Sequence, residues 1–445
     1  MIRRLIFLIF TLLPLYAAAQ STPFAVKSST RYSASTMFGR VEEDSIRYTQ
    51  LRFIQEFNYK KFGLGLDLDF LFDKNYHIKE SDWDHIGDAL GKIYYFRYAE
   101  MGDPFFFHIG GFPKFSTGNG LVMLNYSNMT YYPDLRHNGL LIGGKIPTLF
   151  EPELELFSSD ITKNDLLSFR AHFKPLADST VKILDMATLG FSIYSDLNQY
   201  SNLKHILPDS LDYLRTGKKD AATIISFDYT QPIKRSEKAE YGLYTEVAHM
   251  IDNGTGSILP GVYADFKVVK VNLEYRTNGD RFAPSYFDYH YEEERAFQDT
   301  RADGTPIIIT KERALQDRQS SYGIYGKIQG IIGDRLKAMF AWQNMYGDDL
   351  QNGKSMWFSL NVDTRYKRLE KVAFAYSKTN VNSLSLGKVA VPRANMSASC
   401  TIGLDSKRRW FVIAKYSEKY KDKEGGINWW KDTKRSVAVG VKVNF

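Results

Sequence analysis

The densest group of chemically useful side chains is a run of carboxylates within residues 287–295. Its acidic members are Asp288, Glu292, Glu293 and Glu294. Hard carboxylate oxygens could bind calcium here, or bridge to phosphates through divalent ions. The simpler interpretation is a solvated loop tip, and we favour it. The same region holds Pro306–Thr310, a β-prone segment that could extend a hairpin or bind a partner by strand addition.

The other reactive residues lack the spacing of a catalytic or metal site. The chain has 8 histidines, and none lies three to five residues from another, as a metal motif would require. Cys400 is the only cysteine, which excludes an intramolecular disulfide and a cysteine-ligated zinc site. No Gly-x-Ser-x-Gly motif occurs. We therefore expect no enzymatic activity, no metal and no cofactor.

The end of the sequence has the pattern of a β-strand with two different faces. Because side chains on a strand alternate, one face of residues 436–445 is apolar. This face consists of Val437, Val439, Val441, Val443 and Phe445. Such a strand is typical of the end of an outer-membrane β-barrel, and we expect Phe445 to be the signal that the barrel-assembly machinery reads. A charge at Val441 should be costly in lipid, whereas Gly440→Ser on the other face should be tolerated.

The beginning of the sequence predicts export. Arg3 and Arg4 precede an apolar run from Leu5 to Tyr16, and the alanines before Gln20 form a cleavage site. We therefore expect residues 1–19 to be a signal peptide and residues 20–445 to be a single barrel domain in the bacterial outer membrane. No later stretch approaches the roughly 20 apolar residues of a transmembrane helix.

Composition favours the same class. Aromatic residues make up 15% of the chain although its mean hydropathy is −0.34. In a barrel wall only every second residue is apolar, and aromatic girdles raise the aromatic share. The alternative is a secreted carbohydrate-binding β protein, which would also be rich in Tyr and Trp.

Alternation recurs along most of the chain and indicates one wet and one apolar face. In residues 62–73, aspartates face one side and Phe and Leu the other. The candidate lumen-facing residues are Asp67, Asp69, Asp265, Lys267, Lys327, Asp363 and Arg365. Their mixed signs argue against a strongly ion-selective pore.

Short and long connections between the predicted strands alternate along the chain. Tight turns are expected near residues 59–61, 101–104, 234–237, 333–334, 367–368 and 406–407. Longer segments lie at about 74–91, 113–136, 196–219, 279–318, 380–395 and 419–432. Short periplasmic turns and long extracellular loops are the rule for bacterial barrels. Two weak segments, 32–42 and 148–158, bring the raw count to about 20 strands, so we predict an all-β, antiparallel transmembrane barrel of 16–20 strands, with 18 preferred.

One long segment contains an apolar stretch that should not remain in water. Gly118–Asn128 lies between predicted strands, and we expect it to fold into the lumen, where Leu121, Val122 and Met123 would line a constriction. Packing on another protein is the alternative. With Arg97-Tyr98, Gly102-Asp103-Pro104 and Asp134-Leu135-Arg136, this region resembles uncharacterised, porin-like outer-membrane barrel proteins of the Bacteroidota. The resemblance implies a location and a fold, and no activity.

Two functions remain open. The first is a passive channel for small solutes, with the Gly118–Asn128 segment as its constriction. The second is an accessory barrel with a blocked lumen, whose long loops bind other envelope proteins. The net charge of +7 suits loops that contact lipopolysaccharide phosphates, whereas a nucleic acid is not an expected partner in this membrane.

Overall fold

The computed structural model describes most of the chain between residues 32 and 444. The described residues are 32–43, 46–79, 91–132, 136–201, 203, 220–301, 303–333, 335–348, 353–385, 391, 394–407, 409–421 and 430–444. The predicted signal peptide and Phe445 lie outside them. Among the described residues, no helix is long and apolar enough to cross a membrane.

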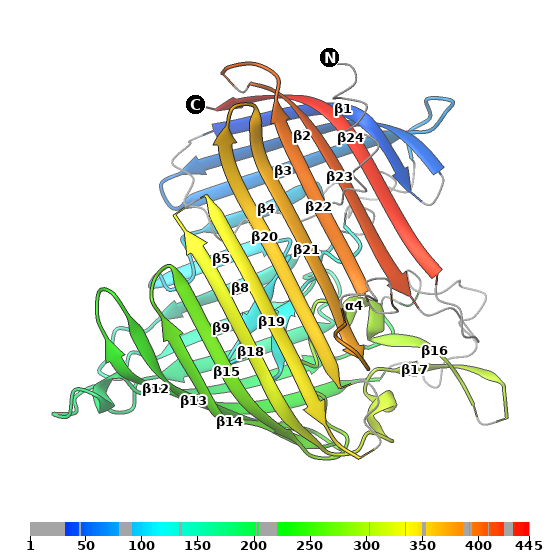
Figure 1. Cartoon of the computed structure of the whole chain (residues 1–445). Coiled ribbons are helices and arrows are strands. Elements are labelled where there is room, and N and C mark those ends of the chain that lie inside the picture. Colours follow the sequence, from blue (N-terminus) through cyan, green and yellow to red (C-terminus); the bar gives the residue numbers. More distant parts are fainter. Residues whose placement is uncertain are drawn as a thin grey trace.

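One 20-stranded antiparallel sheet forms a closed barrel (Figure 1). Each strand pairs with the next along the chain, and β1 pairs with β24 to close the ring. The barrel strands are β1 (Tyr32–Glu43), β2 (Ile46–Tyr59), β3 (Phe62–Phe72), β4 (Ile93–Tyr98), β5 (Phe105–Gly110), β8 (Gly139–Lys145), β9 (Glu153–Ser158), β10 (Leu166–Phe173), β11 (Thr188–Asp196), β12 (Ala222–Arg235), β13 (Glu240–Met250), β14 (Thr255–Asp265), β15 (Val269–Asn278), β18 (Ser321–Ile332), β19 (Leu336–Tyr346), β20 (Lys354–Tyr366), β21 (Leu369–Val381), β22 (Ala394–Gly403), β23 (Trp410–Lys421) and β24 (Trp430–Asn444).

The all-β barrel is confirmed, but the preferred number of 18 strands is wrong, because both weak segments are strands. In β9, the alternation begins only after Pro152, which cannot donate a ladder hydrogen bond, so the strand is short. In β1, the outward face includes Ala34, Thr36 and Arg40, which is a weak lipid-facing pattern. It is held by pairing on both sides, with β2 and β24.

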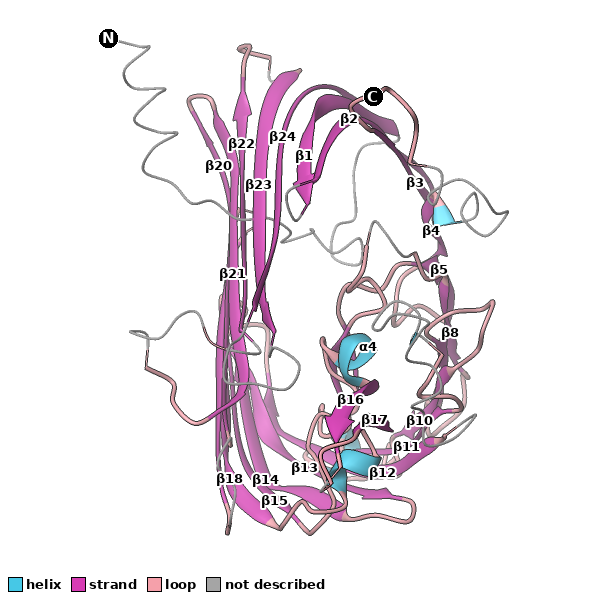
Figure 2. Cartoon of the chain, turned by 90° about the vertical axis from the view of Figure 1, so that its right-hand side faces the viewer, coloured by secondary structure: helices cyan, strands magenta, loops and turns pink. Residues whose placement is uncertain are grey.

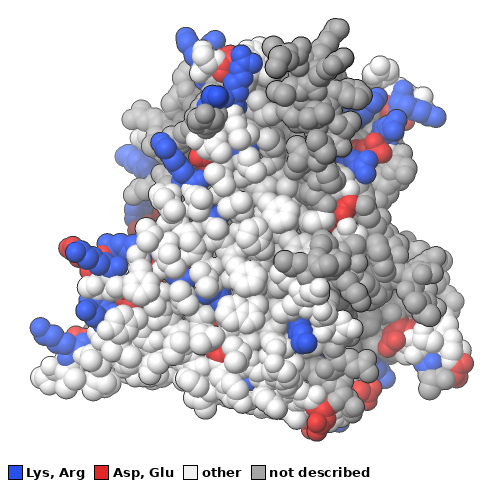
Figure 3. Space-filling view, in the orientation of Figure 1, with Lys and Arg blue, Asp and Glu red and all other residues white. Residues whose placement is uncertain are grey.

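The two faces of the wall follow the predicted alternation. In β3 the lumenal Asp67 and Asp69 are 3% exposed, while the outward Leu66 and Leu68 keep accessible surface. In β24 the outward Val439 is 44% exposed. In Figure 3 most of the visible wall is uncharged, and charged side chains gather at its margins. A closed wall with every strand paired and an apolar exterior is the structure of a bacterial outer-membrane barrel.

The two ends of the barrel differ in their connections, as predicted. All six expected tight turns lie at the end where β24 finishes, which by the rule for bacterial barrels is the periplasmic end. The strand ends that the six long connections join lie at the opposite, extracellular end; these connections are 73–92, 111–138, 197–221, 279–320, 382–393 and 422–429. One connection at the periplasmic end, 174–187, is also long and contains the short helix η3 (Leu184–Met186).

Two of the long connections fold into the barrel. The first insert, residues 111–138, contains the hairpin of β6 (Phe115–Thr117) and β7 (Met123–Tyr126). The second insert, residues 279–320, contains α4 (Tyr291–Glu294), the hairpin of β16 (Ala296–Thr300) and β17 (Pro306–Thr310), and η5 (Arg313–Leu315). Figure 2 shows α4 and this hairpin inside the ring of strands.

Candidate functional site

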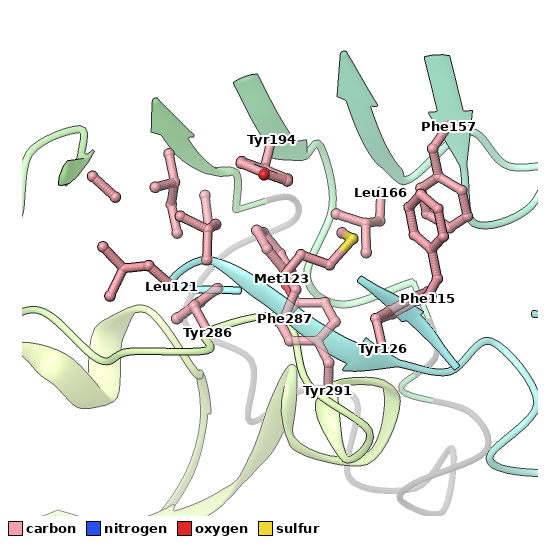
Figure 4. Close-up of a cluster of buried hydrophobic side chains, with 14 of the residues drawn as sticks. Phe115, Leu121, Met123, Tyr126, Phe157, Leu166, Tyr194, Tyr286, Phe287 and Tyr291 are labelled. Atoms are coloured by element: carbon pink, nitrogen blue, oxygen red, sulfur yellow. The ribbon is translucent and has the colours of Figure 1, made fainter. Parts of the chain in front are cut away.

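The first insert is held in the lumen by a hydrophobic core. Leu121, Val122 and Met123 have no exposed surface, and they belong to a cluster with wall residues such as Leu166 and Tyr194 (Figure 4). Each fully buried aliphatic side chain of this size contributes about 1.5–3 kcal/mol. The segment therefore enters the lumen, but its apolar residues anchor the insert to protein and do not face an aqueous constriction.

The cluster defines one side of the barrel, which we call the packed wall: strands β8–β14. The side chains of this wall that join the cluster are Leu141, Phe157, Leu166, Tyr194, Ala222, Ile224, Tyr244, Ala248, Met250 and Ile258, and Phe106 of the adjacent β5 joins it as well. Apart from Phe106, Tyr244 and Ile258, these residues lie near the extracellular ends of their strands. A lumen face of this kind would be costly in water, so it requires a cover, which the inserts provide.

A buried carboxylate fixes the tip of the first insert. Glu246 of β13 accepts hydrogen bonds from the backbone N–H groups of Asn119, at 2.9 Å, and Leu121, at 3.3 Å. The tip can present these donors because Gly118 and Gly120 adopt positive φ angles of 61° and 88°. A Cβ atom on Gly118 would come within 3.0 Å of the Glu246 carboxylate.

Asn128 closes the base of the same insert. Its Oδ1 accepts a hydrogen bond of 2.7 Å from the Phe112 N–H, and its Nδ2 donates to the Ser159 carbonyl at 2.8 Å. Thr117 adds a hydrogen bond of 2.9 Å to the Tyr194 hydroxyl. The buried polar groups of the insert are thus hydrogen-bonded, and the insert is held by these bonds as well as by apolar packing.

The two inserts are joined by backbone hydrogen bonds. The Ser285 N–H donates to the Leu121 carbonyl at 2.6 Å, the Phe287 N–H to the Val122 carbonyl at 3.1 Å, and the Leu124 N–H to the Phe287 carbonyl at 3.1 Å. Residues 285–287 therefore extend the β6–β7 hairpin by a short parallel pairing. The inserts form one unit.

A buried ion cluster fastens this unit to the packed wall. Arg295 contacts Asp196 of β11 at 2.6 Å and Glu292 at 3.0 Å. Tyr291 donates a hydrogen bond of 2.6 Å to Asp196, and Tyr126 of the first insert donates to Glu292. Since a buried ion without a partner costs several kcal/mol, each member depends on the others.

The second insert also contacts β22 and β23, on the side of the barrel opposite the packed wall. Glu293 forms an ion pair with Lys419 of β23, and the imidazole of His290 lies 3.2 Å from the amide of Asn395 of β22. Burial works against the charged form of His290, but Glu293, at 3.4 Å, and Asp288 raise its pKa above the usual value.

The carboxylates of residues 287–295 are thus not a solvated loop tip, and that interpretation is wrong. Glu292 is 2% exposed and pairs with Arg295, and Glu293 pairs with Lys419. Asp288 and Glu294 both lie within 3.6 Å of Lys311. Among the residues that the structure describes, no three His, Cys, Asp or Glu side chains are grouped to hold a metal ion. Arg295 follows Glu292 by only three residues, but Tyr126 and Lys419, which also hold these carboxylates, are distant along the chain and could not be identified from the sequence.

The side of the barrel opposite the packed wall has a different lumen face. We call it the lysine wall: strands β18–β23. Its lumenal face includes buried side chains, such as Tyr325, Ala341 and Ala373, but also many polar ones. These polar side chains, with lysines at intervals, are Lys327, Gln329, Lys337, Ser359, Asn361, Asp363, Lys371, Ser377, Asn395, Ser397, Ser399, Thr401, Lys415, Ser417 and Lys419. All of them keep accessible surface. Strand register places Lys327 and Lys419 at the two ends of one row across this wall, and Lys337 and Lys415 at the ends of another.

Two predicted lumenal residues, Asp67 and Asp69, form a buried polar cluster on β2 and β3, which β24 and β1 separate from the lysine wall. Arg52 of β2 donates to both oxygens of Asp67, at 2.7 and 2.5 Å, and Gln50 donates to Asp69 at 2.8 Å. Arg136, from the returning arm of the first insert, donates to the Asp67 carbonyl at 2.8 Å. Asp67 is thus paired with a cation and its carbonyl holds the insert's arm, whereas Asp69 is bound by the neutral amide of Gln50.

The other predicted lumenal residues lie at different heights. Lys327 and Asp363 are on the lysine wall and face the lumen. Asp265 lies at the periplasmic end of β14, 2.6 Å from Lys270, whereas Lys267 is exposed in the adjacent turn, at the rim and not in the wall. Arg365 belongs to β20, but its side chain is outside those that the structure describes.

A cavity of about 150 Å³ separates the first insert from the lysine wall. Lys114, Leu124 and Asn125 line it from the insert, and the wall side is lined by Tyr325, Lys327, Gln329, Met339, Ala341, Trp357 and Ser359. Lys114 was missed by sequence reasoning. A usable signal existed, since Lys114 and Ser116 alternate with the buried Phe115 and Thr117 across β6.

No family model matches the sequence, and no curated protein matches it. Among solved structures, the ferric enterobactin receptor PfeA of Pseudomonas aeruginosa is 8% identical, with a TM-score of 0.39 over 94% of this chain and 82% of that one. OccAB2 of Acinetobacter baumannii is 8% identical, with a TM-score of 0.37 over 94% and 98%. CdiB of Acinetobacter baumannii is 6% identical, with a TM-score of 0.27 over 93% of this chain, which spans 60% of CdiB. Likenesses this distant carry no argument about function.

Proposed function

We propose that this barrel is a passive outer-membrane channel for small solutes, narrowed by its two inserts. The observation that carries the proposal is the lysine wall. Its lumenal Lys327, Lys337, Lys371 and Lys415 keep accessible surface, while the inserts pack on the opposite side. Because an ammonium group without water or a partner is costly, these side chains require a hydrated path along β18–β23.

The remaining features of the proposal follow from the sequence. Residues 1–19 direct export, Phe445 is read by the barrel-assembly machinery, and basic loops contact lipopolysaccharide. The protein acts without enzymatic chemistry or a cofactor, and it belongs with porin-like barrels of the Bacteroidota type.

The test is the single-channel conductance of the purified barrel in a planar bilayer. A short Gly-Ser linker in place of residues 118–128 removes the Glu246 contacts and the apolar anchor, so the conductance should rise severalfold while the amount of heat-modifiable barrel stays constant. The matched control replaces residues 301–305, which join β16 to β17 and include the exposed Arg301, with the same linker, and should conduct like the wild type. An open wild type whose conductance is unchanged by the first replacement would contradict the role of the insert.

A second function is favoured by one observation. The contacts of Glu293 with Lys419 and of Arg295 with Asp196 tie the second insert to both walls near the extracellular end. An insert that spans the lumen would suit an accessory barrel with a blocked lumen and protein partners on its loops. This alternative predicts negligible conductance for the wild type and for both linker variants, together with an envelope protein that copurifies with the wild type.

A further inference from the structure

The cavity between the first insert and the lysine wall is lined by two cations. Lys114 comes from the insert and Lys327 from β18, and amide or hydroxyl groups of Asn125, Gln329 and Ser359 line the same space. A volume of about 150 Å³ has room for several waters or one small anion. Lys114 keeps accessible surface, but its position within the barrel partly desolvates the ammonium group and lowers its pKa below the usual value.

Neighbouring carboxylates do not neutralise this pair. Within the described part of the chain, neither Lys114 nor Lys327 forms an ion pair, and Glu274, the carboxylate whose charge acts on Lys327, is already occupied by other groups. Glu274 accepts a hydrogen bond of 2.7 Å from the Tyr244 hydroxyl and another of 2.7 Å from Arg276 Nε. The two ammonium groups are therefore free to attract an anion.

Further lysines lead away from the cavity. Lys337, Lys371 and Lys415 face the lumen on β19, β21 and β23, and they lie closer to the periplasmic end than the row of Lys327. Carboxylates on the packed wall are bound by other protein groups: Asp228 contacts Arg170 at 2.6 Å, Glu153 contacts Lys145 at 3.5 Å, and Glu246 accepts the backbone hydrogen bonds of the first insert. The mixed signs of the sequence thus separate in space: the packed wall holds carboxylates bound by protein groups, whereas the lysine wall carries mainly cations, with Asp363 among them.

We infer that the space between Lys114 and Lys327 is an anion-binding constriction, and that the solutes of this barrel are small inorganic or carboxylate anions. This inference rests on the proposed channel function and names its substrate class. The lysines replace part of the water shell of the anion, and the row toward the periplasmic end gives it successive positions.

The first experiment measures the reversal potential of the purified barrel across a KCl gradient. The wild type should prefer chloride to potassium, Lys327→Gln should reduce the permeability ratio, and Lys114→Gln with Lys327→Gln should bring it toward unity. Lys267→Gln is the matched control, because Lys267 is exposed in a periplasmic turn and should keep the wild-type ratio. Equal ratios in all four proteins, or a preference for potassium in the wild type, would overturn the inference.

The second experiment separates the anion site from the channel. Binding of inorganic phosphate to the detergent-folded barrel is followed by calorimetry, with the same variants. Phosphate should bind the wild type and Lys267→Gln, and the double glutamine variant should lose this binding. Binding without any conductance would reject the channel and keep the site, whereas conductance without phosphate binding or chloride preference would keep the channel and reject the site.

Discussion

The packed wall and the lysine wall are built from the same strand geometry but have opposite lumenal surfaces. Near the extracellular end, the packed wall presents residues such as Leu166, Tyr194 and Ile224, all without exposed surface. The lysine wall presents Ser397, Lys415 and similar residues, which keep contact with solvent. The composition of the packed wall therefore determines where the inserts bind, because apolar lumenal residues must be covered by protein. Polar lumenal residues, in contrast, must contact water.

The two walls also differ in how their charged side chains are paired. Ions on the packed side are satisfied by protein, as in the contacts of Arg295 with Asp196 and of Arg170 with Asp228. Lumenal lysines of the other wall, except Lys419, form no ion pair within the described residues. The difference indicates that the fixed part of the lumen and its conducting part are separate regions, each of which can be altered alone.

The largest expected effect comes from breaking the ion cluster on the packed wall. Arg295→Met leaves Asp196 and Glu292 buried without a cation, which costs roughly 3–5 kcal/mol. We expect the inserts to leave the packed wall, so that single-channel conductance rises and external protease cleaves the second insert, while the barrel remains heat-modifiable.

The matched control is Arg301→Met, since Arg301 is exposed at the tip of the hairpin in the same insert. It should leave conductance and protease resistance unchanged. If both variants behave like the wild type, the ion cluster does not hold the inserts.

The next effect tests whether the lysine wall faces water. Cys400 and Ser397 lie on β22 with opposite orientations: Cys400 is on the outward face with Val372, and Ser397 is on the lumenal face. Cys400→Lys should destabilise the barrel by roughly 2–4 kcal/mol if it lies near the middle of the bilayer. Ser397→Lys should be close to neutral in urea unfolding from lipid vesicles. Equal losses would mean that the lumen at this wall is dry.

Where β24 pairs with β1, a lumenal position does not tolerate a larger side chain. Gly440 faces the lumen on β24, as its position in the alternation predicts, yet the expected tolerance of Gly440→Ser is not supported. A Cβ atom there would lie 2.5 Å from Phe411 Cζ and 2.7 Å from the Thr36 carbonyl oxygen. We now expect Gly440→Ser to cost about 1–3 kcal/mol through overpacking, measured by the same unfolding. Ser436→Ala, on the same lumenal face, is the control that should remain stable.

Most of the barrel wall could be predicted from the sequence, because the alternation of a strand and the residues of a turn involve only residues that are close along the chain. Alternation and turn residues identified the faces of β3 and β24, all six tight turns and all six long connections. The number of strands failed only where Pro152 and a mixed outward face weakened the pattern.

The site was less predictable for a physical reason. The entry of residues 118–128 into the lumen followed from their apolar character, but the partners that fix them, such as Glu246 and residues 285–287, are more than a hundred residues away. One sequence does not encode such pairs in any periodic signal. The function of Lys114 likewise depends on Lys327 across the lumen.

The smallest expected effect is a pH dependence at the two ends of the second insert. At the lysine wall, His290 has a raised pKa, because Glu293, Asp288 and Glu294 together outweigh its burial, with Lys419 beyond them. At the packed wall, burial and then Asp220 and Asp252 raise the pKa of Glu312 to about 7, although Asn253 and Gln199 donate hydrogen bonds to it.

The raised pKa values of His290 and Glu312 both stabilise the docked insert at low pH. A histidine with a raised pKa stabilises the docked insert fully below its ordinary pKa, and this contribution is lost as pH rises through the folded value. A carboxyl group with a raised pKa also favours the docked state at low pH, because the folded protein holds its proton up to about 7. Conductance should therefore increase modestly as pH rises from about 5 to about 8. Glu312→Gln with His290→Asn should remove this dependence, whereas His77→Asn, at an exposed position, should keep it. A wild-type conductance that is constant over this range, or that falls, would show that neither contact controls the insert.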